Sequence, residues 1–134
     1  MIIPSRDHPT EIVLVVEHEV MVRHAVSQYL RHCGYQVIEA TSAEEAITVM
    51  SSADIPVNVV FSAVELGEGM NGFALSQWVR DHHAGVDVIL AGTPEKAARE
   101  AGDLCEEGPH LTKPYEPSQV VDWIKRLRNL KPPK

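Results

Sequence analysis

Four short stretches of this 134-residue chain place polar or small residues directly after apolar runs. They are Glu17-His18, Ser62-Ala63, Ala91-Gly92-Thr93 and Thr112-Lys113-Pro114. A carboxylate beside an imidazole is a pair that can bind a transition metal, and Glu65 and His110 are the residues that could complete such a site. Because these candidates are scattered along the sequence, we interpret His18 as a solvated histidine in a loop. Lys113 is interpreted first as an ion-pair partner of Glu17.

The composition indicates one domain: 44% of the residues are apolar, 23% are charged, and the formal net charge is −7. A chain of this length buries a core without disulfides or a metal, and Cys33 and Cys105 are expected to be reduced thiols. The negative charge disfavours binding to nucleic acid or anionic lipid. No segment approaches the ~20 apolar residues of a membrane-spanning helix. We expect a cytoplasmic protein with tails at 1–10 and 131–134 and one domain at 11–130.

Apolar runs alternate with helical periodicity along the chain. The runs predict strands at Ile12–Val16, Tyr35–Glu39, Val57–Phe61, Val86–Leu90 and His110–Thr112. Helices are predicted at Glu19–Cys33, through Ala43–Met50, around Leu75–Val79, from Pro94 toward Gly102, and from Pro117 through Leu127. The first helix is expected to bury Val22, Val26, Tyr29, Leu30 and Cys33 and to stop at Gly34, and Ser42 with Glu45 has the spacing of a capping box.

Five strand-then-helix units predict an α/β fold with a doubly wound parallel sheet and helices on both faces. In such sheets ligands bind beyond the carboxyl ends of the strands. The four polar stretches named above lie at those ends, so they are the candidate functional residues.

Three segments, in this order, carry a resemblance to a known family. They are VLVVEHE at 13–19, VNVVFSAVELGEGMNGFAL at 57–75 and LTKPYEPSQVV at 111–121. Over roughly Glu11 to Leu130 the chain resembles the response-regulator receiver domain (CheY-like). The sequence of the loop after its third strand is similar to that of receivers of hybrid sensor kinases. The resemblance implies a flavodoxin-like sheet of five parallel strands in the order 2-1-3-4-5, flanked by five helices.

In that family two acidic residues after the first strand and an aspartate after the third hold Mg²⁺, and the aspartate accepts a phosphoryl group. A hydroxyl residue after the fourth strand and a lysine after the fifth contact that group. In this sequence the matching positions hold Glu17 and His18, Ala63, either Ala91 or Gly92, and Lys113, while His110 takes the place of an aromatic switch residue. Imidazole is a poor ligand for Mg²⁺, and a methyl group cannot accept phosphate. Of the matching residues only Lys113 is as the family has it.

The sequence therefore predicts a degenerate receiver of two-component phosphorelay signalling. It would have no enzymatic activity, no cofactor and weak or absent Mg²⁺ binding, and it would act by contact with a sensor histidine kinase, another signalling protein, or a second copy through Pro94–Leu130. The alternative is a receiver phosphorylated at a non-standard residue with slow self-dephosphorylation. Ser62 is one candidate, although strand alternation directs its hydroxyl away from the pocket; Glu65, expected to be exposed, could restore a carboxylate. A flavodoxin-like cofactor binder is disfavoured by the acidic stretch 17–19.

Trp123 and the pair of His82 and His83 each have a structural interpretation. Trp123 on the last helix is either an interface anchor or a core residue. His82 and His83 are interpreted as charges that favour the carboxyl end of a helix.

Overall fold

The computed structural model describes residues 11–92, 110–112 and 115–130. Its centre is a parallel sheet of five strands in the order β2-β1-β3-β4-β5, which confirms the predicted α/β class and strand order. The strands are β1 Ile12–Val16, β2 Gln36–Ala40, β3 Val59–Ala63, β4 Asp87–Gly92 and β5 His110–Thr112. The helices are α1 Val20–His32, α2 Ala43–Met50, α3 Gly72–His82 and α5 Pro117–Leu130. The helix expected from Pro94 and the tails at 1–10 and 131–134 lie outside the described residues.

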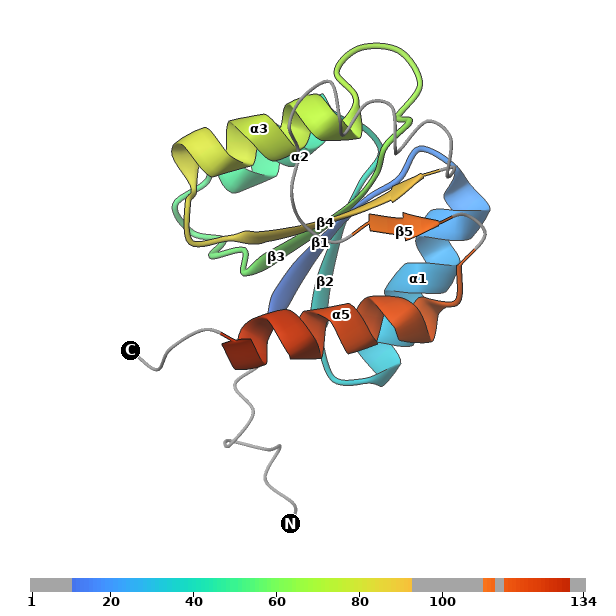
Figure 1. The fold of residues 1–134 in the computed structure, drawn as a ribbon. Helices are drawn as coiled ribbons and strands as arrows, with labels where there is room; N and C mark the ends of the chain where they lie inside the picture. Colours follow the sequence, from blue (N-terminus) through green and yellow to red (C-terminus); the bar gives the residue numbers. More distant parts are fainter. Residues whose placement is uncertain (1–10, 93–109, 113–114, 131–134) are drawn as a thin grey trace.

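The helices form a layer on each face of the sheet, with α2 and α3 on one side and α1 and α5 on the other (Figure 1). Successive residues of β1 point to opposite faces, so Val13 and Val15 pack with α1 and α5 while Leu14 and Val16 pack toward α2 and α3. This double coverage explains why β1 is apolar throughout instead of alternating. No described helix is long and apolar enough to cross a membrane.

The first helix departs from the expected burial pattern near its end. Val26 and Leu30 are buried as predicted, but Tyr29 is 37% exposed and Cys33 is an exposed free thiol. The prediction was wrong for Cys33 because α1 ends at His32, and the C-cap residue no longer follows the helical face. It was wrong for Tyr29 because the buried face of α1 is centred on Val26 and Leu30. Gly34 stops the helix with φ of 101°, as predicted.

The strands β3 and β4 end later than predicted. β3 begins at Val59, not at Val57. Asn58, just before it, pairs with Ile12 through its backbone N–H at 2.9 Å, and its side-chain Oδ1 accepts from the Ile12 N–H at 2.8 Å. β3 extends to Ala63 and β4 to Gly92. Residues expected to lie in loops after these strands are therefore their last residues, held by the sheet.

Candidate functional site

The predicted site residues Glu17, Ala63 and Gly92 lie at the carboxyl ends of the neighbouring strands β1, β3 and β4. Val16 of β1 lies opposite Ser62 of β3, and Ala63 lies opposite Ala91 of β4. Glu17 directly follows β1, Ala63 ends β3 and Gly92 ends β4. The described register therefore places Gly92 one residue beyond the row shared by Ala63 and Ala91.

Two predicted positions at the β5 end are only partly described. The backbone of His110 pairs with Leu90 in the parallel ladder, which places residue 110 at the start of β5. Lys113 and Thr93 lie outside the described residues, and so does the expected pair between Lys113 and Glu17.

Glu17 is buried, with 1% of its surface exposed. Its Oε2 accepts a hydrogen bond from the Glu19 N–H at 3.3 Å and lies 3.6 Å from Nδ1 of His18. The His18 side chain is 42% exposed and lies beside Gly67 of the β3–α3 loop. The first acidic position thus keeps a buried carboxylate, and the second holds an exposed imidazole next to it.

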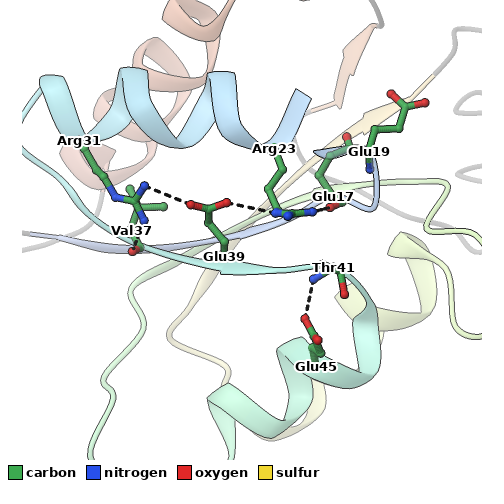
Figure 2. Close-up of polar contacts among 8 residues, drawn as sticks. All are labelled: Glu17, Glu19, Arg23, Arg31, Val37, Glu39, Thr41 and Glu45. Atoms are coloured by element: carbon green, nitrogen blue, oxygen red, sulfur yellow. Dashed lines mark hydrogen bonds and ion pairs between the residues drawn. The ribbon is translucent and has the colours of Figure 1, made fainter. Parts of the chain in front are cut away.

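Arg23 of α1 joins this edge to β2, and sequence reasoning missed it. Its Nη1 donates to the Glu17 carbonyl oxygen at 2.9 Å, and its Nε donates to Oε1 of Glu39 at 3.1 Å (Figure 2). Arg31, two turns further along α1, donates to the other oxygen of Glu39 at 3.1 Å and to the Val37 carbonyl oxygen at 3.1 Å. A signal was present, because both arginines lie on a helix that must pack beside a strand carrying a glutamate.

Tyr115 is a second residue that sequence reasoning missed. Its ring packs edge-on against Phe61 with centroids 5.5 Å apart. Its hydroxyl is buried and has no hydrogen-bond partner in the part of the chain that the structure describes. Burial first, and then the negative charges of Glu17 and Glu19, raise the pKa of this phenol above its ordinary value. The phenol therefore stays neutral beside the carboxylates.

The β3–β4 side of the edge is apolar. Ala63 is 1% exposed, Ala91 and Val64 are fully buried, and Val64 packs with Phe73 and Leu90. Ser62 is also fully buried, and its hydroxyl donates to the Ala63 carbonyl oxygen at 2.8 Å.

The loop from β3 to α3 is held at several points. The Val64 N–H donates to the Ala91 carbonyl oxygen at 2.7 Å, and the Met70 N–H donates to Oε2 of Glu44 on α2 at 3.2 Å. Asn71 caps α3 through the Ala74 N–H. Glu65 in this loop is exposed, as expected.

Two further predictions can be placed. Trp123 is half-buried and packs against the core, and the Arg126 guanidinium lies 4.8 Å from its ring centroid. α3 ends at His82, whose ring stacks on Trp78 at 4.6 Å and whose Nδ1 lies 2.9 Å from the Trp78 carbonyl oxygen. The position of His82 and His83 at a helix carboxyl end is thus confirmed.

The donor atoms at this edge do not fit a magnesium ion. Mg²⁺ requires oxygen ligands in octahedral geometry. Glu17 offers a carboxylate, but His18 offers a nitrogen and Ala63 offers no donor on its side chain. Across the described residues, no group of three or more His, Cys, Asp or Glu side chains could hold a metal ion.

The comparisons with known proteins identify the family. The family model of the response regulator receiver domain matches residues 13–125. The chain belongs to this family. Solved structures with the same fold include a receiver protein from Sinorhizobium medicae, with a TM-score of 0.80 and 17% identity over 90% of this chain and 96% of that one. A CheY-like receiver domain from Methanospirillum hungatei has a TM-score of 0.78 and 18% identity over 90% of this chain and 95% of that one.

Curated relatives agree with this assignment. The chain is 24% identical to the regulatory protein VanR of Enterococcus faecium over 89% of this chain and 51% of VanR. It is 31% identical to the sensor kinase CckA of Brucella abortus over 86% of this chain and 12% of CckA. The chain thus spans about half the length of VanR and a small part of CckA. It is a receiver domain of two-component signalling, a class of domain that works with sensor kinases or other signalling proteins and is generally not enzymatic.

Proposed function

We propose that this receiver domain signals by protein contact and does not accept a phosphoryl group at the end of β3. The observation that carries the proposal is Ala63, the last residue of that strand, which is 1% exposed. A phosphoryl acceptor needs a nucleophilic oxygen, and a methyl group has none.

The other positions of the site support the same conclusion. Phosphoryl transfer depends on positioning and on charges that stabilise the transferring group. His18 and Gly92 bring neither a hard oxygen ligand nor a hydroxyl, so we propose that Mg²⁺ binds weakly or not at all. Lys113 is proposed to be a structural partner of Glu17, and His110 is proposed to be a switch position that receives no phosphorylation signal.

The alternative acceptor is Ser62. Its hydroxyl is fully buried and already donates to the Ala63 carbonyl oxygen, so attack on a phosphodonor would require that bond to break and the strand end to open. Glu65 is exposed and lies two residues beyond Ala63, outside the strand. We therefore favour a domain that is not phosphorylated over one that is phosphorylated at Ser62 or Glu65.

The proposed partner is a sensor histidine kinase or another signalling protein in the cytoplasm. A second copy of this chain, meeting through Pro94–Leu130, is the alternative partner. Direct binding to nucleic acid or membrane is not expected, because the net charge of −7 repels both.

Intact mass spectrometry after incubation with acetyl phosphate and Mg²⁺ tests the proposal. A receiver that has the aspartate at the end of β3 serves as the positive control in a parallel reaction. We expect an adduct on the control and an unchanged mass for this protein. A stoichiometric adduct on this protein would contradict the proposal. If that adduct disappeared in a Ser62→Ala variant, the non-standard acceptor would be identified.

A further inference from the structure

Val64 occupies an unusual place at the edge of the sheet. It directly follows β3, is fully buried, and packs with Phe73 and Leu90. Both of its backbone polar groups are engaged, since its N–H donates to the Ala91 carbonyl oxygen at 2.7 Å and its carbonyl accepts from the Gly72 N–H at 2.8 Å. The position of this side chain is therefore fixed by the backbone as well as by packing.

Gly92 lies directly beneath this side chain. A Cβ atom built at Gly92 would come 2.9 Å from Cγ2 and 3.0 Å from Cβ of Val64. Carbon atoms in contact prefer roughly 3.5–4.0 Å. The Val64 Cβ cannot rotate away, because it is attached directly to the anchored backbone. Residue 92 thus has to be glycine for reasons of space as long as Val64 holds this position.

We infer that Val64 and Gly92 form a size-matched lock that fixes the carboxyl ends of β3 and β4 in one arrangement. This inference goes beyond the proposed function, because it concerns the mobility of this edge and not its chemistry. A switching domain needs a second arrangement close in free energy to the first. Val64 occupies the space beside Gly92 and both of its backbone groups are hydrogen-bonded, so a shift of the β4 end into that space would have to displace the Val64 side chain.

The other end of the β3–α3 loop supports the lock. Oε2 of Glu44 accepts from the Met70 N–H at 3.2 Å, and Gly69 before it has a φ of 90°, a conformation that favours glycine. The loop is thus held to β4 at Val64 and to α2 at Met70. The described carboxyl ends of β3 and β4 would then keep one arrangement when the domain meets its partner.

A double-mutant cycle on the unfolding equilibrium tests the lock. Gly92→Ala should raise the unfolding equilibrium constant about tenfold or more, since overpacking a filled site is destabilising. Gly85→Ala is the matched control, because Gly85 is exposed and has no atom within 4 Å of an added Cβ. When Val64→Ala is combined with Gly92→Ala, the added methyl group at residue 92 should be tolerated. The double variant should therefore lose less free energy of unfolding than the sum of the two single variants.

The cycle also needs a reference pair. Val79 is fully buried in a different core cluster, so Gly92→Ala and Val79→Ala should have additive effects. Additive effects for the Val64 pair as well would overturn the lock. If Gly92→Ala alone fails to fold, recovery of folding in the double variant supports it. If the double variant fails to fold while Val64→Ala folds, the inference is overturned.

NMR relaxation dispersion measures the mobility directly. In the wild-type protein the amides of residues 64–72 and 91–92 should show no exchange on the microsecond-to-millisecond timescale, and Val64→Ala should introduce it. Exchange in the wild-type protein would overturn the lock. The acetyl phosphate experiment gives an independent answer, because an adduct would contradict the proposed function without changing the coupling between Val64 and Gly92.

Discussion

The two halves of the sheet's carboxyl edge have opposite character. On the side of β1, α1 and β2, the edge is polar: Glu17, Arg23, Glu39 and Arg31 are connected by hydrogen bonds to one another or to backbone groups. On the side of β3 and β4, the edge is apolar, with Ala63, Val64, Ala91 and Gly92 packed closely.

The difference shows how each half depends on its partners. A buried charge is kept only where hydrogen bonds or opposite charges compensate its lost hydration, and Arg23 helps to tie the segment of Glu17 to β2. At the end of β3, Ala63 carries no charge, and the neighbouring Val64 and Ala91 are buried and apolar. The polar half should therefore respond to loss of hydrogen bonds and the apolar half to changes in volume.

The largest effect is expected at Gly72, where the β3–α3 loop returns to the edge. A Cβ there would lie 2.9 Å from the Val64 Cα and 3.1 Å from the Ala63 carbonyl carbon, and neither backbone atom can move aside easily. We expect Gly72→Ala to lower the free energy of unfolding by about 3 kcal/mol, at the upper end of overpacking effects. Urea denaturation measures this, with Gly85→Ala as the control. A loss no larger than that of the control would show that the apolar half is loosely packed.

A smaller loss is expected in the polar half. Arg23→Ala removes hydrogen bonds to the Glu17 carbonyl and to the Glu39 carboxylate, which should lower the free energy of unfolding by about 1.5–2 kcal/mol. Arg31→Ala is the matched control, because Arg31 also contacts Glu39 and one backbone carbonyl oxygen but is 39% exposed; its loss should be about 0.5 kcal/mol. Equal losses for the two variants would contradict the prediction, because they would mean that burial adds nothing to the Arg23 contacts.

The junction between the two halves can be tested at Tyr115. Because its hydroxyl is buried without a partner among the described residues, Tyr115→Phe should change the free energy of unfolding at pH 7 by about 0–1 kcal/mol, in the stabilising direction.

Tyr115→Phe should also change how the free energy of unfolding depends on pH in the alkaline range. The pKa of Tyr115 is raised in the folded protein, so its contribution to stability is present below the unfolded pKa of about 10 and is lost as the pH rises above that value. Urea denaturation between pH 8 and pH 11 should show a shallower decline in Tyr115→Phe than in the wild-type protein. Parallel curves would contradict the assigned pKa shift.

The smallest effect is expected at the α2 capping box, next to the polar half. The Thr41 N–H donates to Oε1 of Glu45, and this hydrogen bond lowers the pKa of the Glu45 carboxyl (Figure 2). The carboxylate therefore adds stability above its unfolded pKa, and this is lost as the pH falls through the folded pKa. Glu45→Gln keeps a capping side chain without the charge. Its deficit relative to wild type should be present at pH 7 and absent at pH 3, whereas a deficit that stays constant with pH would contradict the prediction.

Much of the fold was predictable from local patterns. The fully apolar run of β1, the cap of α2 by Ser42 and the stop at Gly34 each depend on neighbours in sequence, and each is confirmed. The return bond of the predicted capping box is shifted by one residue, because Glu45 accepts from the Thr41 N–H and not from the Ser42 N–H. The pairing of Asn58 with Ile12 was not predictable, because its hydrogen bonds join residues 46 positions apart. Cys33 was misplaced because the periodicity was extended past the end of α1 at His32, whereas Tyr29 lies within α1 but beside its buried face.

For the candidate site, the sequence by itself determined that Ala63 carries no side-chain oxygen, since this is a matter of residue type. Tertiary structure decided which groups surround this strand end. The contact between Val64 and Gly92, the bridge from Arg23 to Glu17 and Glu39, and the buried hydroxyl of Tyr115 each join residues from different elements. Side-chain packing and hydrogen bonding act over a few ångströms in space, and only the folded chain brings those atoms within that range.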